Sequence, residues 1–398
     1  MRVSTFNLQQ QSLNVILSQQ SGLARTQLQV ATGRNFSSPA DDPVGAQRAL
    51  QLEQSIGRLE QFSTNGQLAT GRLLVEDSKL SGVVDVIQRV RELVIQASNA
   101  TQTTESRILI ANEIKELNAE LLDIANSENG QGEFIFAGSK TNTRPFARDS
   151  SGVTYSGDQT RRELQIADQR RIADGDTGSR IFLDIPDGNG TFSAVSSSSN
   201  NGTVVIENTA LLDPRLYDEE PYILQFTSET TYEVIPAAGG PAVTQGIYED
   251  GETIAFQGIE LRLSGEPQTG DELQIEPSKA RDVFTTIDGI IEALEAPVQN
   301  ETLRAIARTD LNAGLYNLDQ ALGRVLEVRT DIGSRLNALE NQESSNEELG
   351  IQLRATLSDI VEVDLVDAIS RLNQQLTGLE AAQRSFAQLQ NLSLFNFL

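Results

Sequence analysis

Apolar residues recur at alternating steps of four and three along both ends of the chain, and this spacing limits the fold more than any other feature of the sequence. Such alternation is typical of a coiled-coil seam. The longest seam lies in the C-terminal half, and only Arg329 interrupts it: Leu311, Leu315, Leu318, Leu322, Val325, Arg329, Ile332, Leu336 and Leu339. Each seam is narrow on an otherwise polar helix, so it needs a partner helix in this chain or in another.

Further stripes of the same kind occur near both termini and upstream of the middle. They are Leu13, Leu17, Ala24, Leu28 and Ala31; Leu80, Val84, Ile87, Arg91, Val94 and Ala97; Ile110, Ile114, Leu117, Leu121 and Ile124; and Leu365, Ile369, Leu372, Leu376 and Leu379, continued by Phe386. The first and the last of these lie at opposite ends of the chain. We therefore predict that the chain folds back so that its ends pair, and that the seam at 311–339 packs against the stripes at 80–97 and 110–124.

The middle third is rich in Gly, Ser and Asp and predicts strands and turns. Short segments with strand character are separated there by Gly, Pro, Asn and Asp: residues 181–185, 203–206, 222–227, 232–235, 253–256, 260–263 and 272–275. Several short strands at this spacing favour a sandwich or a barrel-like domain. The Ser-rich stretch at 193–203 predicts a loop.

Together these patterns predict an α+β fold. We expect a long, coiled-coil-like helical bundle formed by the N- and C-terminal regions, with an inserted, mainly-β domain. The bundle is expected at 44–145 and 280–359, the β domain at 146–279, and separate terminal helices at 1–43 and 360–398. Because short amphipathic helices are marginal in water without packing, we expect the terminal helices to be disordered in the monomer.

Composition removes most enzyme and nucleic-acid hypotheses. The chain has 56 acidic and 31 basic side chains, and its net charge of -25 opposes binding to nucleic acid. It has no His and no Cys, which removes the Ser–His and Cys–His nucleophile pairs and the usual zinc sites. No apolar run approaches the roughly 20 residues of a membrane helix, and the N-terminus lacks the apolar core of a signal peptide. We predict no catalytic, cofactor-binding or metal-binding residues, no cofactor and no membrane partner.

Catalysis by carboxylates alone, as in glycosidases, remains the enzyme alternative. The candidate pairs are Asp41 with Asp42 and Glu219 with Glu220. Members of each pair are adjacent in sequence, and adjacent side chains diverge on strands and on helices. Asp41 and Asp42 instead predict a turn and a helix N-cap before Pro43, because Pro suits the first helical turn. The absence of Trp also argues against a sugar site, since such sites commonly use aromatic stacking faces.

Three local strings carry a resemblance to a known family. Residues 37–45 are SSPADDPVG, just after TGRN at 32–35; residues 88–97 are QRVRELVIQA; and residues 132–146 are GEFIFAGSKTNTRPF, followed by YSGD at 155–158. The first two resemble motifs of the bacterial flagellins. The third, together with LSLFNFL at 392–398, is similar to the hook-associated members of that family, which form the junction between hook and filament.

The resemblance implies a structural subunit that joins the hook to the flagellin filament, with no enzymatic activity. Its terminal helices would line the inner tube of the flagellum, the bundle would surround them, and the β domain would face outward. It implies export through the flagellar type III apparatus to an extracellular location, without a cleavable signal peptide. The implied partners are further copies of the chain in a ring or helical array, flagellin, hook-associated protein 1 and a flagellar export chaperone.

Candidate assembly residues follow from the stripes and from the resemblance: Leu13, Leu17, Leu28, Asp41, Asp42, Pro43, Arg89, Arg91, Glu92, Leu372, Leu376, Leu379, Phe386, Phe395, Phe397 and Leu398. We expect residues 41–43 to fix the turn between the terminal helix and the bundle, and residues 395–398 to act as buried terminal anchors. Residues 88–93 also match a flagellin segment that looks like the site read by a vertebrate innate immune receptor. Support of subunit contacts by Arg91 and Glu92 is the interpretation we favour.

A filament-forming flagellin of the same architecture is the closest alternative. Flagellins usually finish in a short aliphatic tail that contains Arg, whereas this sequence finishes in FNFL. The ending therefore favours a junction protein. A generic coiled-coil adhesin would explain neither the turn at 41–43 nor the string at 132–146.

Overall fold

The computed structural model describes residues 5–99, 102–150 and 152–394. Long helices come from both ends of the chain and short strands from the region between them, so the predicted α+β fold is confirmed. The chain forms two compact units, one of residues 65–340 and one of residues 1–64 together with 341–398. Helices α2 (Pro43–Ala97) and α5 (Glu301–Val361) contribute to both units.

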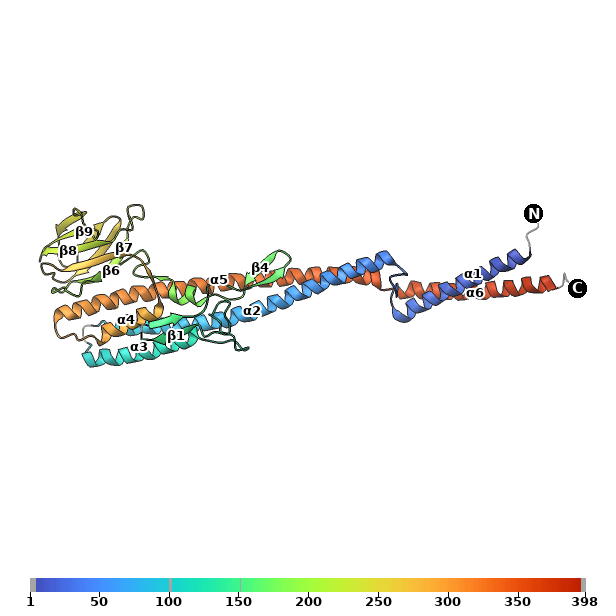
Figure 1. Ribbon diagram of the computed structural model, residues 1–398, viewed down its shortest axis with the longest axis horizontal. Helices are drawn as coiled ribbons and strands as arrows, with labels where there is room; N and C mark the ends of the chain where they lie inside the picture. The colour runs from blue at the N-terminus through green and yellow to red at the C-terminus, as the bar shows by residue number, and fades with distance from the viewer. Residues whose placement is uncertain (1–4, 100–101, 151, 395–398) are drawn as a thin grey trace. The chain divides into compact units, whose positions relative to one another are not determined.

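The unit that contains both chain ends consists of paired helices. Helices α1 (Thr5–Thr32) and α6 (Leu365–Leu394) run side by side (Figure 1), as predicted. In the same unit the first part of α2 buries Ala49 and Ile56, and the last part of α5 buries Asn346. Glu60 and Arg354 join these two helices by an ion pair at 2.8 Å. The apolar side chains buried here are small or few, so this unit has a thin core.

In the other unit, α2 and α5 pack with α3 (Thr104–Ala125) and α4 (Val283–Glu295) around one hydrophobic core. Every seventh residue of the α5 seam is fully buried: Leu311, Leu318, Val325, Ile332 and Leu339. The alternate positions of the seam are half-buried, and Arg329 at one of them bonds to Asp77 of α2 at 2.8 Å. The predicted seam and its packing against α2 and α3 are confirmed. The ion pair with Asp77 explains why a charged residue, Arg329, stands in this apolar seam.

The stripe predicted in α2 is buried at five of its six positions: Leu80, Val84, Ile87, Val94 and Ala97. It was wrong at Arg91, which is exposed. Val83, Val86, Val90 and Leu93 are buried as well, so the buried face of α2 is broader than the predicted stripe. Val90 is buried in preference to Arg91 because a guanidinium in the core would need a buried partner.

Short hairpins and a π-helix pack against the helical core. Strand β1 (Phe146–Asp149) pairs with β2 (Gly152–Tyr155), β3 (Glu163–Ala167) with β4 (Arg170–Ala173), and β5 (Ile185–Pro186) with β14 (Ala280–Arg281). The strand predicted at 181–185 was wrong at residues 181–183, because Ser179–Leu183 forms the π-helix η1, whereas Ile185 lies in β5. Ile181 and Phe182 are both buried, whereas neighbours on a strand would point to opposite faces. The Phe182 ring lies 5.5 Å from that of Phe146.

The remaining strands form two antiparallel sheets with a separate hydrophobic core. They are β6 (Phe192–Ser196), β7 (Val205–Leu211), β8 (Tyr222–Ser228), β9 (Thr231–Pro236), β10 (Thr244–Ile247), β11 (Thr253–Phe256), β12 (Ile259–Ser264) and β13 (Glu272–Pro277). One sheet has the order β10-β9-β8-β13-β6 and the other β11-β12-β7, so the predicted sandwich is confirmed. The loop predicted at 193–203 was wrong in its first residues, because β6 pairs with β13.

Candidate assembly surfaces

The α1–α6 interface mixes polar and half-buried apolar side chains. Thr26 and Ala368 are buried in it, Gly22 faces Gln375, and Gly378 faces Gln19. The side-chain carbonyl oxygens of Gln19 and Gln375 are buried and meet no donor among residues 5–394 that the structure describes. Buried amides without partners are unfavourable. These two amides therefore reduce what the interface contributes to the stability of the two helices.

The predicted stripe of α1 was wrong as the face that pairs with α6, because all five of its residues are exposed and Ile16, Leu23 and Val30 are half-buried instead. The predicted stripe of α6 divides between the interface and the outer surface. Leu372, Leu379 and Phe386 are half-buried, and Phe386 lines a groove between α6 and α1. Leu13, Leu17, Leu28 and Leu376 are exposed, with 40% to 55% of their surface accessible. The same two helices also expose Val15, Leu365, Val366 and Ile369. The sequence missed Val15 and Val366 because both fall outside the alternating spacing.

The segments that connect the helices of this unit pair with each other. The Asn35 N–H donates to the Val361 carbonyl at 2.7 Å, and the Val363 N–H donates to the Gly33 carbonyl at 2.9 Å. Gly33 has a φ of +71°, a left-handed conformation that glycine adopts without strain. The α1–α2 and α5–α6 connections are thus joined by backbone hydrogen bonds.

Asp41 and Asp42 organise the start of α2. The Asp41 carboxylate accepts hydrogen bonds from the Ser37 and Ser38 N–H groups, and Asp42 Oδ1 accepts one from the Gly45 N–H at 2.9 Å. Helix α2 begins at Pro43, so Asp42 is its N-cap, as predicted. The hydrogen bonds of Asp41 and Asp42 do not support a catalytic role as in a glycosidase, because both carboxylates accept hydrogen bonds from backbone N–H groups of the turn and the helix start.

Arg89 and Arg91 join the helices of the bundle, and Glu92 pairs with Arg89 within α2. Arg89 pairs with Glu113 of α3 at 2.7 Å and with Glu92 at 3.2 Å, and Arg91 pairs with Asp319 of α5 at 2.8 Å. The hydrogen bond that Arg89 donates to Glu113 is the main cause that raises the pKa of Arg89. All these side chains are exposed, so the pairs add little stability. The use of Arg89, Arg91 and Glu92 as a contact with other subunits stays a prediction, as does that of the other candidate assembly residues. Phe395, Phe397 and Leu398 lie outside the described residues.

Helix α2 carries a glutamate at a core position that the sequence reasoning missed. The alternating steps from Ala69 through Leu73 to Leu80 include Glu76, and its side chain is fully buried. Glu76 Oε1 accepts the Asp176 N–H at 3.0 Å, whereas Oε2 has no partner within the described chain. Burial, and then the charge of Asp176, raises the pKa of Glu76 to about 8. The side chain is therefore a neutral carboxylic acid at neutral pH.

Buried ion pairs surround Glu76 and tie the segment after β4 to both long helices. The Asp176 carboxylate is fully buried and bonds to Arg335 of α5. Asp174 is also buried and bonds to Arg72 of α2. Breaking one such pair leaves an uncompensated buried charge, which is strongly destabilising. An acidic residue at a heptad core position was the signal in the sequence that could have indicated this network.

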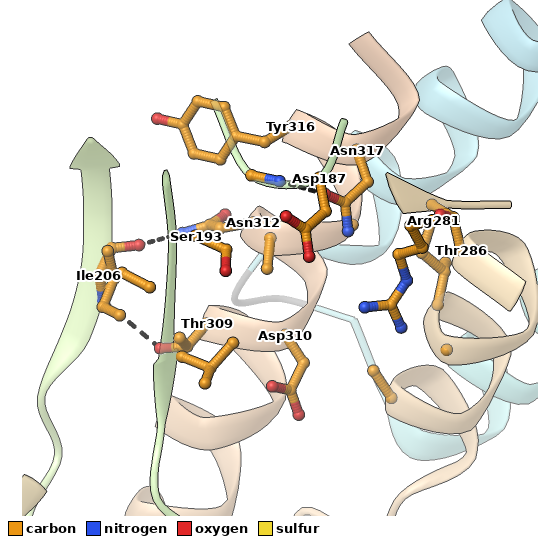
Figure 2. Close-up of a pocket in the computed structure, with 18 of the residues that line it drawn as sticks. Asp187, Ser193, Ile206, Arg281, Thr286, Thr309, Asp310, Asn312, Tyr316 and Asn317 are labelled. Atoms are coloured by element: carbon orange, nitrogen blue, oxygen red, sulfur yellow. Dashed lines mark hydrogen bonds between the residues drawn. The ribbon is translucent and has the colours of Figure 1, made fainter. Parts of the chain in front are cut away.

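A cavity of about 380 Å³ lies between strands β6 and β7 and helices α4 and α5 (Figure 2). Polar groups on the β side of the cavity form hydrogen bonds with side chains of α5 on the other side. The Ile206 N–H donates to Thr309 Oγ1 at 3.4 Å, and Asn312 Nδ2 donates to the Ile206 carbonyl at 3.0 Å. The Gly188 N–H donates to Asn317 Oδ1 at 2.7 Å. The lining of this cavity therefore serves to attach the sandwich to α5.

Within residues 5–99, 102–150 and 152–394, no group of three or more Asp or Glu side chains is arranged to hold a metal ion. No helix in these same ranges is long and apolar enough to cross a membrane.

Comparison with known proteins identifies the family. Residues 3–141 match the bacterial flagellin N-terminal helical region, and residues 315–398 match the flagellin C-terminal helical region. Flagellar hook-associated protein 3 of Escherichia coli K12 is 27% identical over 396 residues, which is 99% of either chain. The crystal structure of hook-associated protein 3 from Legionella pneumophila superposes with a TM-score of 0.75 at 32% identity, covering 78% of this chain and 98% of that one. The chain belongs to the flagellar hook-associated protein 3 family.

A second solved structure, FlgL from Xanthomonas campestris, gives a TM-score of 0.73 at 31% identity over 77% of this chain and 99% of that one. By contrast, the filament core protein of Treponema phagedenis matches only 32% of this chain. The hook-associated protein 3 family thus accounts for the whole length, and the flagellin alternative does not. The chain is a structural component of the extracellular flagellum at the hook–filament junction, it assembles with other flagellar components, and it is not an enzyme.

Proposed function

We propose that α1 and α6 are the element through which the chain assembles with further copies of itself, in a ring or helical array. The observation that supports this is the set of exposed apolar side chains on these helices, which includes Leu13, Leu17, Leu28, Leu365, Ile369 and Leu376. Burying one such side chain contributes about 1.5–3 kcal/mol, so the set favours contact with a neighbour over contact with water. A contact between different faces of identical subunits propagates into an array.

The proposal keeps the three-part division expected from the sequence. Residues 1–43 and 360–398 line the inner tube and order only when neighbours cover them, which the scarcity of fully buried side chains in α1 and α6 supports. Residues 44–145 and 280–359 form the surrounding bundle, and residues 146–279 face outward. Ordering on contact has an entropic cost, and the apolar area buried between subunits offsets it.

The proposed partners are hook-associated protein 1 on the hook side, flagellin on the filament side and an export chaperone before assembly. The flagellar type III apparatus exports the chain, and the absence of Cys removes disulfides that would block the passage of an unfolded chain. Phe395, Phe397 and Leu398 are the proposed terminal anchors, and Arg91 with Glu92 supports subunit contacts on the bundle.

Charge substitutions on the outer face of α1 test this proposal. Leu17→Glu and Leu28→Glu change exposed side chains that make no part of the α1–α6 interface, but the glutamates oppose burial against a neighbour. The matched control is Leu212→Glu, which places the same change on an exposed leucine of the sandwich. Immunogold labelling of isolated flagella should show one band at the hook end for the wild type and the control. The two α1 variants should instead be exported into the medium; normal labelling of both would contradict the assembly role of α1.

A further inference from the structure

Two oppositely charged side chains line the cavity between the sandwich and the helices, and neither takes part in the hydrogen bonds that attach the sandwich to α5. Arg281 of β14 and Asp310 of α5 form no ion pair and no side-chain hydrogen bond within residues 5–99, 102–150 and 152–394. Figure 2 shows the Arg281 guanidinium directed toward the middle of the cavity, with Asp310 across from it. The two charges therefore face the same space without neutralising each other.

An arginine without a carboxylate is unusual at this degree of burial in this unit. Arg162, Arg180 and Arg329 are half-buried like Arg281, and each bonds to a carboxylate of a neighbouring segment. The Nε of Arg281 is enclosed by protein, so the two Nη groups are what this side chain offers to the cavity. A charge with restricted access to water is unfavourable without a partner. A carboxylate in the cavity would therefore be stabilised by Arg281.

Asp310 lacks a positive partner in the same cavity. Its side chain is accessible to water through the cavity, yet the surrounding protein removes enough of that water to raise its pKa. Asp187 and Glu292 also line the cavity, so carboxylates outnumber the one guanidinium. An ammonium group in the cavity would therefore be stabilised by Asp310.

The size and the lining of the cavity suit a small organic molecule. Its volume of about 380 Å³ lies in the range of about 300–1,000 Å³ that is typical of small-molecule pockets. Ile206, Ile290 and Ala313 provide apolar surface beside the charged groups. The walls are held together, since the Tyr316 hydroxyl donates to Asn208 Oδ1 at 2.6 Å in addition to the bonds at Ile206. A preformed site of this kind loses little conformational entropy on binding.

We propose that this cavity binds a small zwitterion of the amino-acid class, with its carboxylate on Arg281 and its ammonium group on Asp310. The two Nη groups of a guanidinium can hold a carboxylate at two points. The surplus of lining carboxylates favours a ligand with a second ammonium group, as in lysine. A lone anion would leave Asp310 without a partner, and a lone cation would leave Arg281 without one. The site lies within a single copy of the chain, so it does not depend on the assembly of copies.

Titration of the purified chain with L-lysine tests the site. The NMR methyl signals of Ile206 and Ile290, which line the cavity, should shift saturably as lysine is added at constant ionic strength. Arg281→Gln and Asp310→Asn should each weaken binding about tenfold or more, because each removes one charged partner of the ligand. The absence of a saturable shift in the wild type would overturn the site.

Matched controls make the same chemical changes outside the cavity. Arg171→Gln and Asp168→Asn change exposed side chains of the β3–β4 hairpin and should bind lysine as the wild type does. Equal weakening by the controls and by the cavity variants would show a general charge effect and refute the proposal.

Acetate and methylammonium test whether both charges of the ligand are recognised. Each probe carries only one of the two groups and should bind at least tenfold more weakly than lysine; equal binding of either would overturn a zwitterion site. Lysine should also raise the Tm of the wild type, because it binds the folded chain. Without lysine, Arg281→Gln and Asp310→Asn should keep the wild-type Tm, since neither side chain has a partner in the described chain. A lower Tm in either variant would show a structural role for that side chain and contradict the proposal.

Discussion

Replacing the buried Glu76 by Gln should remove a large part of the pH dependence of folding. Glu76 is fully buried on α2, and its carboxyl accepts a hydrogen bond from the Asp176 N–H at 3.0 Å. Glutamine has the same shape as the protonated acid and keeps this acceptor, but it cannot ionise. Glu76→Gln therefore fixes the side chain in the neutral form that the buried site favours.

The magnitude follows from the pKa, which burial raises from 4.5 to about 8. Between these two pH values the folded chain holds a proton on Glu76 that the unfolded chain has lost. The contribution of Glu76 to stability is thus fully present below pH 4.5, falls as pH rises and is lost above about pH 8. The total change is on the order of 5 kcal/mol.

Urea unfolding followed by far-UV circular dichroism suits this test, because the chain has no Trp and much helix. The free energies of unfolding of wild type and Glu76→Gln should be similar near pH 5. At pH 8 the variant should be more stable by several kcal/mol. The difference in free energy of unfolding between the two proteins at each pH excludes the other titrating groups, because both proteins share them. A difference that stayed constant from pH 5 to pH 8 would show that Glu76 does not titrate in this range, and would refute the reasoning.

Further predictions concern the bundle and the two chain ends. Leu318→Ala, at a fully buried seam position, should lower the free energy of unfolding by about 2–5 kcal/mol in urea. Leu322→Ala, at a half-buried seam position, should lower it by less. Glu120→Ala, on the exposed face of α3, should lower it by under about 0.5 kcal/mol. Equal losses at positions 318 and 322 would contradict the alternating burial. Limited proteolysis of the monomer should trim the segments at 1–43 and 360–398 before the bundle, and uniform resistance would speak against their disorder. Deleting residues 393–398 should leave the circular dichroism of the bundle unchanged but prevent incorporation into flagella, and normal incorporation would rule out the anchor role.

The long helices were predictable because their periodicity is strong and local. In α5, apolar residues at steps of four and three place Leu311, Leu318 and Val325 in the core. In α2 the same rule placed Leu80, Val84 and Ile87 in the core correctly but also assigned Arg91 to the stripe. Tertiary packing buries Val90 and leaves Arg91 exposed. Periodicity thus gave the helix and its partner helices, while the contact face needed the structure.

Short elements were predicted less well, because their conformation depends on distant partners. Ser193 and Ser196 favoured a loop, yet β6 exists because Phe192 and Ala194 alternate into the sandwich core and β13 provides its hydrogen bonds. The hairpins β1–β2 and β3–β4 have too few residues for a periodic signal. Among the candidate assembly residues, Leu17 and Leu28 were chosen because they belong to an apolar stripe. Their exposure was not predictable, because it depends on which face of α1 meets α6.

The central claim is that neighbouring copies cover the outer face of α1, and cysteine labelling tests it most directly. The chain has no Cys, so Leu17→Cys introduces a single thiol, and Leu212→Cys on the sandwich provides the control. A maleimide reagent should label both positions in the purified monomer. In isolated flagella, position 17 should be protected while position 212 stays reactive. Equal labelling of position 17 in the monomer and in the flagellum would contradict the claim.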